Sequence, residues 1–165
     1  MRGYKKTLVA VIVLCFLAVG MIPLLSDTAR CEVRMVKGQT IYVPAYSHIY
    51  HGDKERPFDL AVTLSIRNTD PVHAIDLITV DYFDTEGKKV RSYLESELKL
   101  GPMVSTRYVV PESDSSGGSG ANFIVRWKSS EKVSEPIAET VMISTRTQQG
   151  ISFTSRGQVV REDSL

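Results

Sequence analysis

The stretch that decides the fold is Leu60–Arg67, which reads L-A-V-T-L-S-I-R. Its large aliphatic side chains occupy every second position, and smaller or polar side chains lie between them. Successive side chains of a β-strand point to opposite faces of the sheet. Strict alternation over eight residues therefore predicts a half-buried strand, with Leu60, Val62, Leu64 and Ile66 on the buried face.

A second strand is predicted over Ile75–Asp84, with Ile78, Val80 and Tyr82 on one face. The motif D-T-E-G-K begins at its last residue, and its glycine can take the positive φ that a tight turn requires. We therefore expect Lys89–Leu94 to return beside this strand as a hairpin partner.

Five further segments are short, rich in β-branched or aromatic residues, and bounded by Gly, Pro, Asn or Ser. They are Thr40–Tyr46, Thr106–Val110, Asn122–Trp127, Ile137–Thr145 and Ile151–Thr154. About eight short strands with no amphipathic helix between them predict an all-β, antiparallel β-sandwich. An immunoglobulin-like topology is favoured, with a jelly roll or a small barrel as the alternative. Trp127 is expected in the core.

Composition and length favour one globular domain. The chain has 165 residues, of which 42% are hydrophobic and 24% are charged, and its formal net charge is +1. Outside residues 1–31 the balance is sixteen basic and eighteen acidic side chains, a net charge of −2. Nucleic-acid binding needs a basic surface to neutralise phosphates. We therefore expect no nucleic acid among the partners.

The N-terminus has the pattern of an export signal. Three basic residues within Met1–Lys6 precede Thr7–Leu25, a run of 19 residues without a charge. That length lies between a signal peptide and a membrane-spanning helix. We expect either cleavage after Cys31 or retention of residues 7–25 as a single anchor in the inner membrane. In both cases the basic residues stay in the cytoplasm, and the domain is exported to the periplasm or cell envelope.

These features divide the chain into residues 1–31 (signal peptide or anchor), 38–160 (one β-domain) and 161–165 (a frayed tail). The two cysteines are Cys15, inside the apolar run, and Cys31. The domain therefore contains no internal disulfide, and its stability must come from packing. Lipidation of Cys31 is disfavoured, because Arg30 occupies a position where lipidation requires a small residue.

His48, His51 and Asp53 form the strongest metal-ligand candidate. Histidines three apart on an extended strand point to opposite faces, so both could bind one ion only if the chain turns there. His51 and Asp53 could also converge across such a turn. Zinc or copper needs further ligands, and no cysteine supplies one. We therefore expect no cofactor, and polar turn residues are the favoured interpretation.

The segment Ser113–Ala121, S-D-S-S-G-G-S-G-A, predicts a flexible loop between two strands. Its G-G-S-G-A superficially resembles the nucleophile elbow of hydrolases, with Ser119 as the nucleophile. That elbow requires a helix after the serine and a histidine base nearby, and here a strand is predicted to follow. A phosphate loop is disfavoured because no Lys-Ser or Lys-Thr pair follows the glycines. A calcium loop is disfavoured because the alternating acidic ligands and the closing glutamate are missing. An enzyme is not expected.

Gln148 and Gln149 precede a glycine and an apolar strand, which suggests either a recognition loop or a cap on a sheet edge. Our leading hypothesis is a non-enzymatic module that binds another envelope component through loops at one end of the sandwich. The candidate loops are His48–Asp53, Ser113–Asn122 (with Ser119 and Asn122) and Gln148–Gly150. A small-ligand or metal-binding protein using His48, His51 and Asp53 is the alternative. Membrane contact is expected only through residues 7–25, if they are not cleaved.

Four segments together resemble a family of uncharacterised bacterial exported proteins, known only as a domain of unknown function. They are Y-V-P-A-Y-S-H-I-Y (42–50), L-S-I-R-N-T-D (64–70), S-G-G-S-G-A-N-F (116–123) and Q-Q-G-I-S-F (148–153). The resemblance extends over about residues 38–160. It implies a secreted or membrane-anchored β-protein, and it implies no catalytic residue, cofactor or partner.

Overall fold

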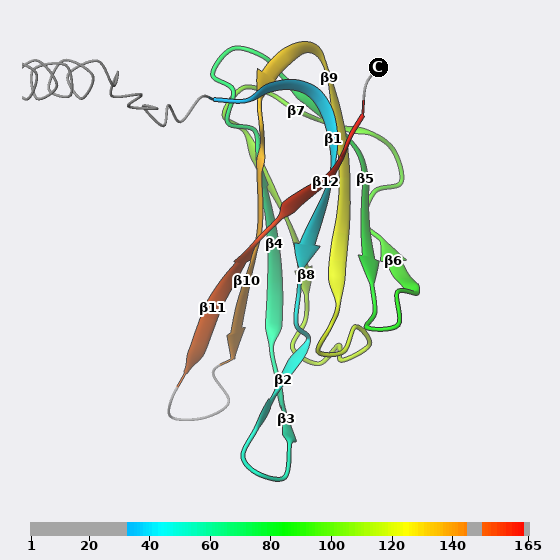
Figure 1. Cartoon of the computed structure of the whole chain (residues 1–165), viewed down its shortest axis with the longest axis vertical. Helices are drawn as coiled ribbons and strands as arrows, with labels where there is room; N and C mark the ends of the chain where they lie inside the picture. The colour runs from blue at the N-terminus through cyan, green and yellow to red at the C-terminus, as the bar shows by residue number, and fades with distance from the viewer. Residues whose placement is uncertain (1–32, 145–149, 164–165) are drawn as a thin grey trace, which may run out of the picture. The chain divides into compact units, whose positions relative to one another are not determined.

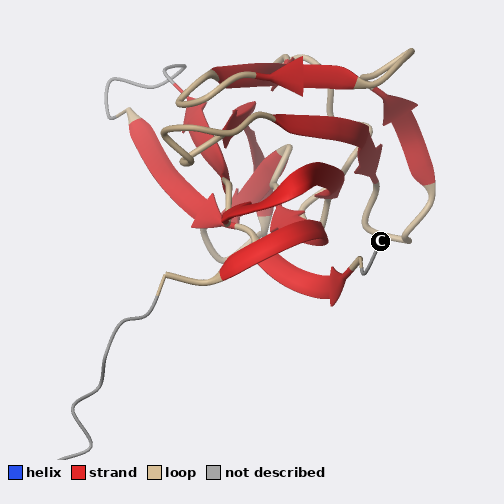
Figure 2. Cartoon of the chain, turned by 90° about the horizontal axis from the view of Figure 1, so that it is seen from above, coloured by secondary structure: helices blue, strands red, loops and turns tan. Residues whose placement is uncertain are grey.

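The structure, a computed structural model, describes residues 33–144 and 150–163. This part of the chain consists of β-strands and loops without a helix (Figure 2). It therefore contains no helix long and apolar enough to cross a membrane. The all-β prediction is confirmed for the described residues.

Twelve strands are formed by the described residues. Their bounds are β1 Met35–Pro44, β2 His48–His51, β3 Arg56–Asp59, β4 Ala61–Arg67, β5 Ile75–Phe83, β6 Lys89–Ser92, β7 Leu98–Leu100, β8 Ser105–Val110, β9 Asn122–Ser134, β10 Ile137–Ser144, β11 Ile151–Arg156 and β12 Gln158–Glu162. All eight predicted strands are present. The four that the sequence did not predict, β2, β3, β7 and β12, have three to five residues each.

The strands form two larger antiparallel sheets and one separate hairpin (Figure 1). The first sheet has the order β12-β1-β9-β5-β6, with β7 also paired to β5. The second has the order β11-β10-β4-β8, and β2 pairs only with β3. The predicted hairpin is confirmed, because β6 returns beside β5 after a turn in which Gly87 has a φ of 77°.

Both larger sheets bury one face in the same hydrophobic core. On β4, Val62, Leu64 and Ile66 have no exposed surface, as the alternation predicts. From the other sheet, Phe123 and Trp127 of β9 are also fully buried. The predicted position of Trp127 in the core is therefore confirmed.

The predicted face of β5 is wrong at one residue. The pairing of β5 with β9 shifts between Leu77 and Thr79, so Ile78 is an extra residue in a β-bulge. An extra residue reverses the alternation on its N-terminal side. Leu77 consequently joins Val80 on the buried face, while Ile78 remains partly exposed.

The two sheets are linked along one side by β11 and β12, which are separated only by Gly157. β11 pairs with β10 in one sheet, and β12 pairs with β1 in the other. The amide of Gly157 donates to the carbonyl of Ala138 at 2.8 Å. A Cβ at this position would lie 2.7 Å from Cγ2 of Ile41 and 2.9 Å from the carbonyl oxygen of Ala138. The crossing therefore requires glycine for close approach.

The C-terminal boundary differs from the sequence prediction. Of the segment 161–165, expected to fray, Arg161 and Glu162 belong to β12 and pair with β1. The amide of Asp163 donates to the carbonyl of Gly38, and Arg161 donates to the Asp163 carboxylate. Hydrogen bonds and ion pairs hold these residues on the first sheet.

The end of the domain where β1 begins and β9 ends is called the base here. Its loops are joined through two buried polar side chains, Asn68 and Asp70. Asn68 donates to the carbonyls of His73 and Gly101, at 2.8 and 2.9 Å. Asp70 accepts from the amides of Val72, His73 and Ser134. The base is thus a hydrogen-bonded unit that connects both sheets.

We predict that Gly157→Ala lowers the free energy of unfolding by about 1–3 kcal/mol, because the added Cβ has no space at the crossing. Chemical denaturation measures the loss. The matched control is Gly150→Ala, because the nearest atom to its Cβ is a carbonyl oxygen at 3.7 Å. Equal stability of the two variants would show that β11–β12 is not packed as described.

Asp70 should make the stability depend on pH. The amides of His73 and Val72 hold its pKa below the ordinary value of 3.8. A lowered pKa in the folded state stabilises the protein above the unfolded value, and this stabilisation is lost as pH falls through the folded value. Asp70→Asn should therefore destabilise the protein more at pH 7 than in acid below the folded pKa. Urea titrations of both proteins at several pH values measure this; a constant difference would contradict it.

Candidate functional site

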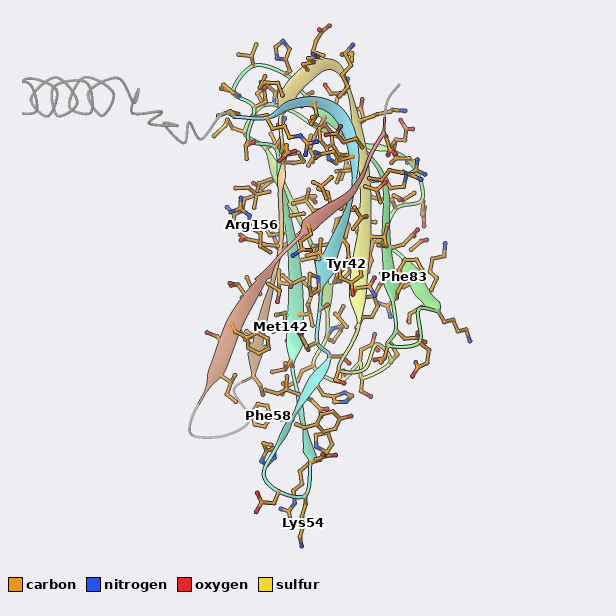
Figure 3. The ribbon with its side chains drawn as sticks, in the orientation of Figure 1. Tyr42, Lys54, Phe58, Phe83, Met142 and Arg156 are labelled. Atoms are coloured by element: carbon orange, nitrogen blue, oxygen red, sulfur yellow. The ribbon has the colours of Figure 1, made fainter. Side chains whose placement is uncertain are left out.

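The candidate site lies at the end of the domain opposite the base, and we call it the hairpin end. It comprises the β2–β3 hairpin, the turn 84–88, the loop 111–121 and the outer part of the β10–β11 pair. The hairpin projects beyond the two larger sheets, with Lys54 at its tip (Figure 3). Antiparallel pairing explains why these segments gather, because β1, β5, β8 and β10 all end on the same side.

The hairpin has an anchored side and an exposed side. Ile49 and Phe58 are partly buried and pack against the core. By contrast, the side chain of Tyr50 is 55% exposed, although it is large and aromatic. The turn at the tip contains Gly52 with a φ of 67°, and the amide of Glu55 donates to the carbonyl of Gly52. The hairpin therefore packs against the core on one side and presents an aromatic side chain and a charged tip on the other.

The two histidines of the hairpin are not brought together. Both lie within β2, and the chain turns only after His51. His48 contacts the ring of Tyr50, with Nε2 3.2 Å from the hydroxyl oxygen, whereas His51 packs edge-on against Phe58 at 6.0 Å between centroids. Residues three apart on a strand face opposite ways. The possibility of a turn that joins both imidazoles is thus not realised.

His51 and Asp53 do line a common concavity at the hairpin tip, together with Gly52, Lys54 and Arg56. Two permanent cations therefore accompany the single carboxylate. Nearby positive charges oppose the binding of a metal cation. Within residues 33–144 and 150–163, no group of three or more His, Cys, Asp or Glu side chains is arranged to hold a metal ion.

The glycine-rich loop is fixed to its neighbours by hydrogen bonds. The hydroxyl of Thr85 donates to the carbonyl of Gly117 at 3.1 Å and accepts from the amide of Gly120 at 3.1 Å. The amide and the hydroxyl of Ser47 both donate to the carbonyl of Gly118. The loop is therefore joined to the turn 84–88 and to the start of the hairpin, contrary to the flexibility expected from its composition.

Close packing against Tyr82 explains one of the glycines. A Cβ at Gly117 would overlap the hydroxyl of Tyr82, which is 1% exposed. Burial raises the pKa of Tyr82 to about 12. Ser47 lies close to this hydroxyl, but it donates to Gly118 instead. Among the described residues the Tyr82 hydroxyl thus has no hydrogen-bond partner of good geometry.

Ser119 and Asn122 take different positions. Ser119 lies within the loop between β8 and β9, so a strand follows it rather than the helix of a nucleophile elbow. Asn122 is the first residue of β9, is 9% exposed, and pairs with Pro44 on one side and Phe83 on the other. Its side chain is mostly covered by the sheet, so little of it is available to a partner.

The strands that flank the third predicted loop, β10 and β11, have their neighbouring ends at the hairpin end. Gln148 and Gln149 are outside the described residues, but the strands that flank them are described. Ser144, the last residue of β10, donates to Glu112 at 2.9 Å and pairs with Ile151. Ring contact between Tyr46 and Phe153, 5.8 Å between centroids, connects β11 to the segment that leads into the hairpin.

Sequence reasoning did not identify the exposed apolar residues of this end. Ile143 and Ile151 are 44% and 36% exposed, and Tyr50 is the third member of the group. Ile143 follows the alternation of β10 and points away from the buried face that includes Met142. That alternation was the available signal, since an isoleucine on the outer face of a predicted strand is a candidate for contact with a partner.

We predict that Tyr82→Phe leaves the free energy of unfolding at pH 7 unchanged or raises it, because the buried hydroxyl makes no good hydrogen bond. Because the pKa of Tyr82 is raised from 10.0 to about 12 in the folded protein, the unfolded state loses its proton at lower pH than the folded state does. The folded protein therefore loses stability as the pH rises from 10 toward 12. The variant should therefore lose less stability over this range. Tyr50→Phe, which removes an exposed hydroxyl, is the control; identical alkaline profiles for wild type and Tyr82→Phe would contradict the assignment.

Comparison with known proteins gives one structural similarity and one family. The fold is similar to the crystal structure of Thermotoga maritima 1070, with a TM-score of 0.45 and 11% identity over 78% of this chain and 97% of that chain. No curated protein matches the chain. The family described as "Protein of unknown function (DUF3124)" matches residues 38–160, the same range as the resemblance in the sequence. The chain therefore belongs to the family of proteins of unknown function DUF3124.

Proposed function

We propose that this protein is a non-enzymatic binding module of the cell envelope, and that it contacts another envelope component with its hairpin end. The N-terminal pattern of basic residues followed by an uncharged apolar run supports export. The absence of a ligand cluster among the described residues and the separate contacts of His48 and His51 support binding over metal chemistry.

The scaffold that we infer is an immunoglobulin-like sandwich. In that fold, strands B and E are neighbours in one sheet, and C and F are neighbours in the other. The pairs β4·β8 and β5·β9 occupy these places in chain order, with β6 as the added strand beside C. The outer strands differ: β1 lies where the last strand of an immunoglobulin domain would pair with F, and β10 lies beside B. The pairing of the four central strands supports the assignment.

One observation carries the proposal: the hairpin projects beyond the core with an exposed aromatic side chain and mixed charges. Tyrosine side chains supply large contact area with little loss of conformational freedom, and they are frequent in binding hot spots. Exposed Ile143 and Ile151 lie at the same end as Tyr50. Charged residues at the tip, such as Lys54 and Arg56, add polar groups to the hairpin that carries Tyr50.

The direction of β1 favours the same end. β1 has ten residues and runs from the base toward the hairpin. At about 3.3 Å per residue, the hairpin end lies about 30 Å from Val33. The hairpin end is therefore the end of the described domain opposite Val33.

The metal-binding alternative has less support. It depended on convergence of His48, His51 and Asp53, and only the last two share a surface. The neighbouring Lys54 and Arg56 disfavour a cation there.

We predict that a photo-crosslinking amino acid at Tyr50 or Ile143 forms a specific adduct in intact cells. Both side chains are exposed, so replacing them should leave the fold intact. The matched control is Val160 on β12, which is 60% exposed and lies in the other larger sheet, beside the middle of β1. Adducts are detected by a shift in gel mobility and identified by mass spectrometry.

Substitution then tests whether the contact contributes energy. Tyr50→Ala together with Ile143→Ser should reduce recovery of the crosslinked component about tenfold, as the loss of about 1.4 kcal/mol would do. Val160→Ser should not change it. Adducts from Val160 alone, or recovery unaffected by the double substitution, would refute the hairpin end as the contact surface.

A further inference from the structure

The base of the domain also exposes apolar side chains, in two adjacent loops. Val72 and Met103 are 69% and 66% exposed, and Val104 is 45% exposed. Pro71 and Pro102, which precede the first two, are exposed as well. Isolated exposed apolar residues are ordinary, whereas several together on neighbouring loops mark a surface that something covers.

The two loops are held beside each other by backbone hydrogen bonds. The amide of Met103 donates to the carbonyl of Asp70 at 3.1 Å, and the amide of Asn68 donates to the carbonyl of Val104 at 3.0 Å. The side chain of Asn68 also reaches the carbonyl of Gly101. Val72 and Met103 are therefore presented by a single hydrogen-bonded unit.

The backbone of this unit is strained at Met103, whose side chain is exposed. Met103 has a φ of 58°, in the left-handed region that side chains other than glycine rarely adopt. Backbone strain of this kind persists where the surroundings enforce it, and here Asp70 and Gly101 accept hydrogen bonds from the turn. Exposure of Met103 is thus built into the turn.

The two loops also contain few charged side chains. Within residues 68–74 and 101–104 the only carboxylate is Asp70, and it is buried and bound to backbone amides. The one titratable group exposed in these loops is His73, whose Nδ1 lies 3.4 Å from Asp70. The two loops themselves therefore hold no exposed acid that anionic headgroups would repel, and at the adjoining end of β9 the exposed Glu131 is next to the exposed Lys132.

The apolar loops lie beside the start of the domain. Arg34 forms an ion pair with Glu135 at 3.4 Å, and Thr69 donates to the carbonyl of the same Glu135. The apolar loops and Val33 therefore share the base. Only eight residue steps separate Leu25, the end of the uncharged run, from Val33, so the chain between them spans at most about 28 Å.

We propose that Val72, Met103 and Val104 rest on a phospholipid bilayer, the membrane in which residues 7–25 are anchored. The occupant is a lipid surface because the chain itself tethers this end within reach of one, and because the loops combine exposed apolar side chains with no exposed acid. Contacts at the boundary between headgroups and acyl chains suit such residues. The inference rests on the proposed envelope location with residues 7–25 retained as an anchor, and it does not depend on the hairpin end binding a partner.

Membrane contact at the base would orient the domain. The apolar loops would act as a second attachment to the bilayer, in addition to the anchor. The hairpin end would then face away from the lipid.

Tryptophan fluorescence in vesicles tests this on the full chain. The sole native tryptophan, Trp127, has no exposed surface, so its emission is a constant background. Val72→Trp, Met103→Trp and the control Lys54→Trp are each reconstituted into vesicles of phosphatidylethanolamine and phosphatidylglycerol with brominated acyl chains. Bromolipid should reduce the added emission by roughly half or more at Val72 and Met103, and it should leave Lys54→Trp unchanged.

Each other outcome overturns the proposal. Equal quenching of all three variants by aqueous acrylamide, without quenching by bromolipid, would mean that the base is solvated. Protection of Val72→Trp and Met103→Trp from both quenchers would mean that a protein surface, such as a second copy, covers the loops. Absence of the full chain from the membrane fraction of cells would mean that residues 7–25 do not anchor it. Crosslinking at the hairpin end is scored separately, so failure of either proposal leaves the other measurable.

Discussion

The burial of one complete face of β4 is the constraint on which the other elements depend. Val62, Leu64 and Ile66 have no exposed surface, which a single sheet cannot achieve. A second sheet must cover that face, and β9 supplies Phe123 and Trp127 for this purpose. The backbone groups of β4 are paired on both edges, by β10 and β8. The hydrophobic effect therefore requires two layers, and hydrogen bonding requires at least three strands in one of them.

Two connections with different chemistry hold these layers together. On one side, β11 and β12 form a nearly continuous strand that leaves one sheet at Gly157 and joins the other. At the base, Asn68 and Asp70 satisfy backbone amides and carbonyls of several loops at once. A buried amide and carboxylate are stable only when such partners are present. The domain thus has no need of a disulfide among its described residues, since packing and satisfied polar groups perform that role.

The predictability of each element depended on how many alternating positions it offers. β4 and β9 present three or more buried side chains at period two, and both were predicted. β12 is exposed at all five positions, so it carries no alternation, and β2 and β3 have four residues each. The bulge at Ile78 could not be predicted because it depends on the register of β9. For the site, the common end of the loops followed from antiparallel order and the separation of His48 from His51 followed from strand alternation, whereas the burial of Asn122 depended on local pairing.

The two ends of the domain differ in how their apolar side chains are supported, and this difference bears on what each end can contact. At the base, Val72 and Met103 are carried by loops that are fixed to both sheets, and Met103 keeps a strained φ. Such a surface cannot adapt, which suits a partner that is itself fluid. At the hairpin end, Tyr50 lies on a two-stranded element that pairs with neither larger sheet. Ile49 and Phe58 pack one side of this hairpin against the core, and Tyr50 remains exposed. The proposed lipid contact at the base and the proposed contact with an envelope component at the hairpin end therefore rest on different kinds of support.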